Sequence, residues 1–268
     1  MNLKYPEDFI NHVINGDSLE ILKLIPSNSI DLIITSPPYN VGTAYDIWND
    51  DLFEDEYWEF TRKWIKKSSR ILKVGGRIAI NIPVMGNNSL MKKSNKYLFH
   101  LSEYLELIKS ELSLRECITW IKSFAEYDEN IFCGGNTAWG SWLSPSNPYL
   151  RSFSEFIIIA HKNNPKIQHS GNTDLTKDEF LRFTKNVWFF PPESDRTHPA
   201  PFPRELPYRC IKLYSYINDI ILDPFCGWGT TCLVAKQLHR NYIGIDISNK
   251  YCKMARSRLS QTTLDEIK

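Results

Sequence analysis

The chain has 268 residues and a formal net charge of +1, and 42% of its residues are hydrophobic and 24% charged. A chain of this length and hydrophobic content can bury one good core, so we expect one domain that carries an insertion. The near-neutral charge excludes a protein that is basic throughout. Any surface that binds nucleic acid must therefore be a local patch, with the acidic residues elsewhere.

Six cysteines are scattered along the chain without a CxxC pair or zinc-site spacing, and the six histidines show no HxxxH spacing. The first residues, MNLKYPEDF, lack the basic and apolar regions of a signal peptide. No apolar run approaches the length of a membrane span. We therefore expect free thiols, no metal ion, no membrane contact and a cytoplasmic location.

Short apolar runs rich in isoleucine and valine alternate with amphipathic stretches, which is typical of a largely parallel sheet covered by helices. The predicted strands are His12–Ile14, Ile30–Thr35, Arg77–Ile82, Glu116–Ile121, Glu155–Ala160, Asp219–Leu222 and Tyr242–Ile245. The predicted helices are Glu54–Leu72, Tyr97–Leu112, Leu206–Tyr216, Thr230–Leu238 and Lys250–Leu259. Two stretches rich in glycine, proline or polar residues, Ser123–Arg151 and Lys162–Pro207, are expected to be loops and irregular structure.

The strand predicted at Ile30–Thr35 runs into the sequence Ser36-Pro37-Pro38-Tyr39. Two prolines fix φ and remove two N–H donors, so the Pro37 carbonyl can project rigidly from the end of the strand, where open α/β sheets bind ligands. The Ser36 hydroxyl and this carbonyl can accept hydrogen bonds from an exocyclic amino group of a base, which would localise the nitrogen lone pair for methylation. Tyr39 could stack on a base extruded from the duplex. Taken alone, the same residues could form an ordinary diproline turn.

The strand predicted at Asp219–Leu222 runs into DPFCGWGTT at residues 223–231 and then into a helix. Glycines there let the backbone turn sharply and approach a ligand, and the helix N-terminus offers unpaired N–H groups. Asp246, at the end of the next predicted strand, can hydrogen-bond both hydroxyls of a ribose. The GxGxxG and Gly-Lys-Ser/Thr patterns are absent, so a nucleoside without phosphate, such as S-adenosylmethionine, fits better than a dinucleotide. A purely structural turn is the alternative.

Together these motifs resemble those of the DNA amino-methyltransferases in the permuted order called the β class. In that class the Ser/Asp-Pro-Pro-Tyr segment comes first, a target-recognition region follows, and the S-adenosylmethionine loop lies near the C-terminus. The chain has the same order. Three further segments resemble the family: HVINGDS (12–18), whose acid approaches the cofactor adenine, ITWIK (118–122), a Trp-x-Lys strand, and HPAPFP (198–203), which precedes the helix over the methionine moiety.

The resemblance implies a Rossmann-like methyltransferase fold with a seven-stranded mixed sheet and a reversed hairpin at one edge. It implies S-adenosylmethionine as methyl donor, double-stranded DNA as substrate and a companion restriction endonuclease. Residues 1–122 would form the catalytic half, 123–200 a target-recognition insertion with one core strand at about 155–160, and 201–268 the cofactor-binding half. Whether the protein is a monomer or a homodimer stays open.

The motifs predict a set of site residues for each role. The predicted catalytic residues are Ser36, Pro37, Pro38 and Tyr39. The predicted cofactor-binding residues are Asp17, Asp223, Pro224, Phe225, Gly227, Gly229, Thr230, Thr231 and Asp246. The candidate DNA contacts, from a flap after the catalytic turn, a basic loop and an aromatic loop, are Tyr45, Lys92, Lys93, Trp139, Trp142 and Arg151. The basic loop could equally be a solvated face, and the aromatic side chains could pack the insertion.

Ser36 also bears on the target base, because adenine-specific members of the family usually carry Asp or Asn there. Its presence predicts N4 of cytosine, with N6 of adenine as the alternative. Trp228 stands between the two glycines, where the family usually has a small residue. It either adds a wall to the adenosine pocket or spoils the loop, which would leave a DNA-binding subunit without activity. C5-cytosine methylation is excluded because the chain has no Pro-Cys dipeptide.

Overall fold

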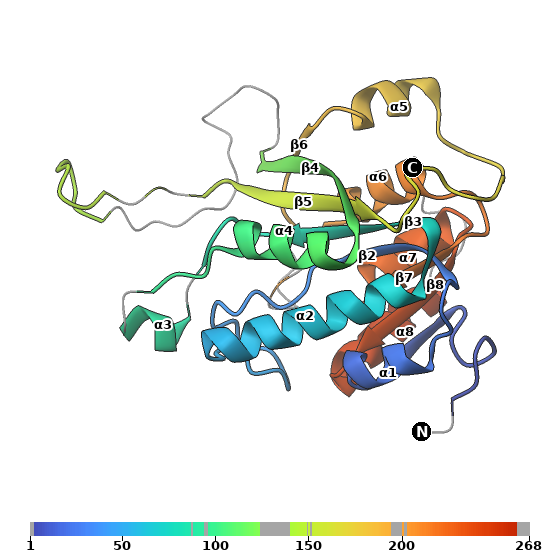
Figure 1. Cartoon of the computed structure of the whole chain (residues 1–268), viewed down its shortest axis with the longest axis horizontal. Helices are drawn as coiled ribbons and strands as arrows, with labels where there is room; N and C mark the ends of the chain where they lie inside the picture. Colours follow the sequence, from blue (N-terminus) through green and yellow to red (C-terminus); the bar gives the residue numbers. More distant parts are fainter. Residues whose placement is uncertain are drawn as a thin grey trace.

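The computed structural model describes residues 3–86, 88–93, 96–123, 140–148, 150, 152–193, 200 and 203–261. Within them the chain forms one mixed sheet of eight strands (Figure 1). The strands are β1 (His12–Asn15), β2 (Ile30–Thr35), β3 (Leu72–Ile82), β4 (Ser113–Lys122), β5 (Ser154–His161), β6 (Val187–Phe190), β7 (Ile220–Asp223) and β8 (Asn241–Asp246). The helices are α1 (Ser18–Leu24), α2 (Glu54–Ile71), α3 (Ser89–Lys93), α4 (His100–Glu111), α5 (Lys177–Phe183), α6 (Glu205–Tyr214), α7 (Thr230–Gln237) and α8 (Asn249–Gln261). No helix in these ranges is long and apolar enough to cross a membrane.

Helices cover both faces of the sheet, and each layer contributes to its own hydrophobic cluster. α1, α2 and α4 pack on one face, and α6, α7 and α8 pack on the other (Figure 1). Successive residues of β2 alternate between the two clusters, with Ile33 in the first and Leu32 and Ile34 in the second. All residues of β2 are buried, because helices cover both sides of this central parallel strand.

The strand order is β1-β8-β7-β2-β3-β5-β4-β6. From β1 to β3 all neighbours are parallel, β5 is antiparallel to both β3 and β4, and β6 is parallel to β4. The predicted α/β fold with a mixed sheet is confirmed. Every strand and helix predicted from the sequence is present, most with ends shifted by only a few residues.

The stretch Lys162–Pro207 is not the loop that was predicted. It contains α5 and β6, so the sheet has eight strands instead of seven. Thr176 and Glu179 form a capping box at the start of α5, and Trp188 in β6 is only 1% exposed. These elements, like the unpredicted helices α1 and α3, are too short to show a clear hydrophobic period.

The parallel strands place the sequence motifs at one edge of the sheet. Asp17 follows β1, and Ser36 follows β2. Asp223 and Asp246 are the last residues of β7 and β8. All four strands run in the same direction, so these residues meet at their carboxyl ends, where open α/β sheets bind ligands.

Candidate active site

A pocket at the carboxyl ends of β1, β2, β7 and β8 brings the two sets of motifs together. The predicted catalytic and cofactor-binding residues that line it are Asp17, Ser36, Pro37, Pro38, Tyr39, Asp223, Phe225, Gly227, Thr230 and Asp246. Tyr45, from the predicted flap, lines it as well. Pro224, Gly229 and Thr231 lie outside its lining. Segments from opposite ends of the chain therefore face one cavity.

The glycine loop between β7 and α7 turns through two residues with positive φ. Gly227 has a φ of 51° and Gly229 a φ of 83°, values that glycine adopts without strain. A Cβ atom at Gly229 would lie 2.8 Å from the Cβ of Ala255 in α8. Gly229 therefore lets α7 approach α8 closely. This glycine faces α8, which agrees with its absence from the pocket lining.

Asp246 ties the glycine loop to the end of β8. Its carboxylate accepts hydrogen bonds from the backbone N–H groups of Gly227 at 2.9 Å and Ser248 at 2.8 Å. Burial raises the pKa of this carboxyl group above its usual value. Each carboxylate oxygen can accept more than one hydrogen bond, so Asp246 retains acceptor capacity toward the pocket that it lines.

Asp223 connects the cofactor loop to the catalytic turn. One carboxylate oxygen accepts from the Thr35 hydroxyl at 2.8 Å and from the Phe225 N–H at 3.1 Å, and the other accepts from the Thr231 hydroxyl at 2.7 Å. Burial raises the pKa of Asp223 to about 6. Thr35 directly precedes Ser36, so this carboxylate fixes the end of β2 relative to the start of α7.

Asp17 sits at the start of α1 and caps it. Its carboxylate accepts from the backbone N–H of Leu19 at 2.6 Å. The neighbouring Ser18 hydroxyl donates to the Pro224 carbonyl, which fastens this helix to the glycine loop. The Pro224 carbonyl therefore makes a structural contact with α1. Asp17, which caps this helix, is held at the pocket by that contact.

Trp228 forms part of the pocket wall. It is only 6% exposed, and the guanidinium carbon of Arg258 lies 4.2 Å from the centre of its ring. Arg258 also donates to the Trp228 carbonyl at 2.9 Å. A cation stacked on an aromatic face holds the ring in place, so Trp228 is an ordered wall that leaves the glycine loop intact.

The Ser36 hydroxyl belongs to a chain of polar side chains behind the pocket. Its Oγ lies 2.6 Å from the Tyr39 hydroxyl. The Tyr39 hydroxyl accepts from Asn81 Nδ2 at 2.8 Å, and its hydrogen has two acceptors, the Asn81 carbonyl at 3.1 Å and Glu155 Oε2 at 3.3 Å. Lys122 donates to the other Glu155 oxygen at 2.5 Å. Burial raises the pKa of Tyr39 well above its ordinary value, so the phenol stays protonated.

Helices α2 and α4 hold the backbone of the catalytic turn. The Tyr57 hydroxyl donates to the Pro38 carbonyl at 3.0 Å, and Nε2 of His100 lies 2.5 Å from the Tyr39 carbonyl. Burial lowers the pKa of His100, which favours the neutral ring. Neutral donors therefore fix the turn without adding charge next to the pocket.

Motif comparison missed several residues of the site. Asn81 and Glu155 lie in β3 and β5, where their neighbours read as ordinary strand residues. The pocket lining that was not predicted also includes Ser18, Ile47, Trp48, Phe60, Cys226, Ile247, Ser248 and Tyr251. The ring of Trp48 lies 4.6 Å from that of Phe60, so the segment that follows the predicted flap packs on α2. For Trp48, the available sequence signal was an aromatic residue a few positions after the catalytic turn.

The other candidate DNA contacts lie outside the pocket lining. Lys92 and Lys93 end the short helix α3 and are exposed. Trp142 is 64% exposed, and the segment that carries it projects from the molecule (Figure 1). Trp139 and Arg151, like most of the predicted HPAPFP segment, fall outside the described residues. Roles in DNA binding for these residues stay predictions.

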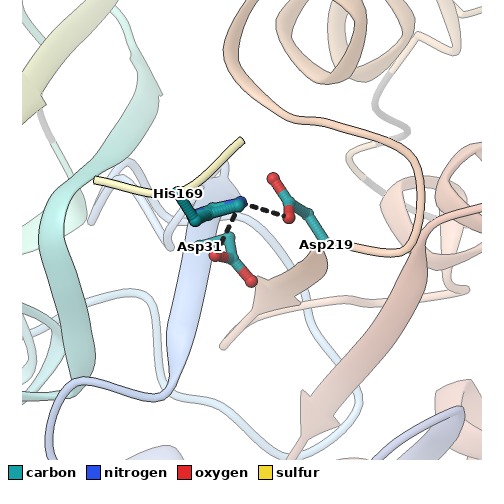
Figure 2. A group of neighbouring side chains, drawn as sticks. All are labelled: Asp31, His169 and Asp219. Carbon is teal, nitrogen blue, oxygen red and sulfur yellow. Dashed lines mark hydrogen bonds and ion pairs between the residues drawn. The ribbon is translucent and has the colours of Figure 1, made fainter. Parts of the chain in front are cut away.

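A separate group of titratable side chains lies at the opposite edge of the sheet, where β2 and β7 begin (Figure 2). Nε2 of His169 lies 2.8 Å from Asp219 Oδ1 and 3.8 Å from Asp31 Oδ1. Histidine and aspartate side chains can ligate metal ions. The spacing of histidines in the sequence does not predict this group, because its three members are far apart along the chain. The Lys73 ammonium lies 2.7 Å from the same Asp31 oxygen. We therefore interpret the group as an ion-pair cluster that fastens the segment around His169 to the sheet.

The chain is similar to curated DNA methyltransferases. It is 36% identical over 188 residues to the type II methyltransferase M.MjaVI of Methanocaldococcus jannaschii, covering 69% of this chain and 87% of that protein. It is 30% identical over 264 residues to the type II methyltransferase M.BglII of Bacillus subtilis, covering 96% and 71%. It is also 30% identical over 266 residues to the DNA adenine methyltransferase YhdJ of Escherichia coli, covering 92% and 82%.

Solved structures share the fold. TTHA0409, a putative DNA modification methylase from Thermus thermophilus in complex with S-adenosyl-L-methionine, superimposes with a TM-score of 0.71 at 23% identity, covering 93% of both chains. The PvuII DNA methyltransferase, which is cytosine-N4-specific, superimposes with a TM-score of 0.68 at 19% identity, covering 96% of this chain and 92% of that one. At these identities the likeness concerns the fold.

Residues 30–257 match the model of a DNA methylase family, the N6/N4 methyltransferases. The chain therefore belongs to the N6/N4 DNA methylase family. It is an S-adenosylmethionine-dependent DNA methyltransferase, and the resemblance recognised from its motifs is confirmed.

Proposed function

We propose that the protein methylates N4 of cytosine in duplex DNA, as the modification enzyme of a restriction–modification system. The observation that carries this proposal is the position of Ser36, whose hydroxyl lies at a pocket that is also lined by Gly227 and Asp246. Relatives named type II methyltransferases, with 30% identity or more over most of the chain, support the biological role. A companion restriction endonuclease is the expected partner.

The pocket lining suits S-adenosylmethionine. Asp246 keeps acceptor capacity for the ribose hydroxyls, and the rings of Phe225 and Trp228 offer apolar walls for the adenine. Asp17 and Asp223 are further carboxyl groups that can meet the polar and cationic groups of the ligand. When bound, this cofactor supplies an electrophilic methyl group attached to a sulfonium.

Ser36 and Pro37 activate the amino group of the target base in this proposal. The exocyclic nitrogen is a poor nucleophile because its lone pair is delocalised into the ring. The Ser36 hydroxyl and the Pro37 carbonyl accept hydrogen bonds from its two N–H groups, which draws the nitrogen toward tetrahedral geometry. Tyr39 lines the same pocket, so its ring can stack on a base flipped out of the duplex.

DNA would approach through the open side of the pocket. Tyr45 and Trp48 lie in the segment that crosses the pocket, next to the catalytic turn. Lys92, Lys93 and Trp142 are exposed side chains that could contact the backbone or the grooves. We keep the division into a catalytic half (1–122), a target-recognition insertion (123–200) and a cofactor-binding half (201–268) as part of this proposal.

Methylation of N6 of adenine is the second candidate. It is favoured by the similarity to YhdJ, which is named a DNA adenine methyltransferase and aligns with 92% of this chain. The same acceptors would serve an adenine amino group. Ser36 remains the reason for preferring cytosine, since the family usually places an acid or amide there in adenine-specific members.

The experiment that tests both candidates uses the wild-type protein, unmethylated bacteriophage DNA and S-adenosylmethionine. The reacted DNA is digested to nucleosides and analysed by mass spectrometry. N4-methyldeoxycytidine is the expected product, and N6-methyldeoxyadenosine would establish the second candidate in its place. A protein that binds the cofactor but forms neither product from any double-stranded DNA would overturn the proposed function.

A further inference from the structure

The polar chain behind Ser36 ends in a charged pair that does not line the pocket. The carboxylate of Glu155 and the ammonium of Lys122 lie 2.5 Å apart, and their side chains are only 14% and 21% exposed. Asn81 Nδ2 donates to the second Glu155 oxygen at 2.6 Å. An ion pair that is largely removed from water is costly to desolvate and is weak evidence for stability, so its place next to the catalytic turn calls for another reason.

The charge of Glu155, together with the Asn81 carbonyl 3.1 Å from the Tyr39 hydroxyl, favours one direction for the neighbouring hydroxyl hydrogens. A carboxylate only accepts hydrogen bonds, so it favours the arrangement in which the Tyr39 hydroxyl donates to it. Tyr39 then has a lone pair left for the Ser36 hydroxyl, which lies 2.6 Å away. When Ser36 donates its hydrogen to Tyr39, the lone pairs of the Ser36 oxygen face the pocket, and Ser36 can act there only as a hydrogen-bond acceptor.

The opposite arrangement would work against the reaction. If Tyr39 donated to Ser36, the Ser36 hydrogen would point toward the pocket and meet the N–H groups of the base, a contact between two donors. Asn81 contributes on both sides: its Nδ2 group donates to Tyr39 and Glu155, and its backbone carbonyl, 3.1 Å from the Tyr39 hydroxyl, is a second inward acceptor. Both acceptors favour the inward direction, and among the described partners of Tyr39, Glu155 is the charged one, which can also take up a proton.

We propose that Glu155, held by Lys122, is a positioning residue that makes Ser36 a hydrogen-bond acceptor and takes up the proton released by methylation. This inference rests on the proposed function, but it applies equally to cytosine and adenine. The nitrogen bonds to the methyl carbon as the carbon–sulfur bond breaks and leaves its electron pair on sulfur. The nitrogen then loses one proton to Ser36, the Ser36 proton moves to Tyr39, and the Tyr39 proton moves to Glu155.

The test compares Glu155→Gln with the wild type and with Glu116→Gln, a matched control in the neighbouring strand β4 whose carboxylate is 48% exposed. Glu155→Gln should lower kcat by about 100-fold, as expected when a proton acceptor is lost, with unchanged affinity for S-adenosylmethionine by calorimetry. Glu116→Gln should leave both unchanged. Wild-type turnover measured in mixtures of H₂O and D₂O should show several protons in flight, and Glu155→Gln should lose that signature.

Two further variants keep the inference falsifiable. The double variant Lys122→Met/Glu155→Gln removes the stranded ammonium and should stay slow; recovery of the wild-type rate would assign the loss to an unpaired charge and overturn the inference. Tyr39→Phe keeps the ring but breaks the chain of hydroxyl groups, and it should also be slow even if Glu155→Gln does not fold. Full activity of either Tyr39→Phe or Glu155→Gln contradicts the inference while the proposed function stands. A wild-type protein without any methylated base overturns both.

Discussion

Buried or partly buried carboxylates lie at both edges of the sheet, but their partners differ. At the carboxyl edge, Asp223 and Asp246 accept hydrogen bonds from hydroxyl and backbone N–H groups, which carry no charge. At the amino edge, Asp31 and Asp219 lie beside the cationic side chain of Lys73 and the imidazole drawn in Figure 2. The first pair lines the pocket at the catalytic turn, whereas the second lies in a small recess that Lys73 and His169 also line.

This difference distinguishes a binding site from a structural contact. Neutral donors hold a carboxylate in position but leave its charge, so it can still attract polar and cationic groups of a ligand. At the amino edge the Lys73 ammonium pairs with Asp31, and side chains of the chain itself occupy the space around the two carboxylates. Substitutions at the carboxyl edge should therefore change binding or turnover, whereas substitutions at the amino edge should change stability alone.

The largest effect is expected for Ser36→Ala at the carboxyl edge. Loss of the hydroxyl removes an acceptor that acts on the amino group, so kcat should fall by about 100-fold to 1,000-fold. Affinity for S-adenosylmethionine should not change, since the cofactor meets other residues of the pocket. Steady-state methyl transfer and calorimetry measure the two quantities, and an unaltered rate would remove Ser36 from the mechanism.

Asp246→Ala should weaken binding of S-adenosylmethionine by about tenfold to 100-fold, because hydrogen bonds between a charged group and ribose hydroxyls are among the stronger ones. The same change frees the Gly227 N–H, which Asp246 holds. Asp246→Asn is the matched variant. It keeps one acceptor, so its affinity for S-adenosylmethionine should lie between those of the wild type and Asp246→Ala. An unchanged dissociation constant for Asp246→Ala would contradict the ribose assignment.

Asp223 should make the stability of the fold depend on pH. Its pKa is raised by burial to about 6, so the stability associated with its protonated form is present below the unfolded pKa and is lost as pH rises through about 6. Asp223→Asn stays neutral and can keep an acceptor for Thr35 or Thr231. Its free energy of unfolding, relative to the wild type, should improve by roughly 2–3 kcal/mol between about pH 4 and pH 8. Chemical unfolding across that range measures the difference, and a difference that does not vary with pH contradicts the role of burial.

The smallest effect is expected for His169→Ala at the amino edge. The side chain of His169 is 38% exposed, and exposed ion pairs contribute up to about 1 kcal/mol to folding. The free energy of unfolding should therefore fall by no more than about that amount. Turnover and cofactor affinity should match the wild type; a loss of either would mean that the two edges do not differ as described.

The sequence predicted the carboxyl edge better than any other part of the molecule. Strand β2 was predicted with its observed bounds because its six residues are all apolar except Asp31 and Thr35. The Ser36 turn and the glycine loop carry local signals, since proline and glycine restrict the backbone in recognisable ways. Parallel strands then dictate that such loops meet at one edge, so the meeting of the two motifs at one pocket followed from the predicted parallel sheet.

Other features depend on contacts between distant residues and leave no local pattern. Glu155 reaches Tyr39 only because β5 lies beside β3 in the sheet, and neither residue indicates this in its own segment. The cluster of Asp31, His169 and Asp219 has the same origin. Strand β6 was missed because four residues show too little alternation, although the Thr176-x-x-Glu179 capping box before it was a usable sign of α5.

The most direct test of the account is to express the chain in a bacterial host without DNA methyltransferases and to map modified bases in the host genome by single-molecule sequencing. The account predicts N4-methylcytosine at every copy of one short sequence, and a much smaller modified fraction when Ser36→Ala is present at the same level as the wild type. An unmodified genome in cells that contain folded, cofactor-binding wild-type protein, or modification by Ser36→Ala at the wild-type rate and extent, would contradict it.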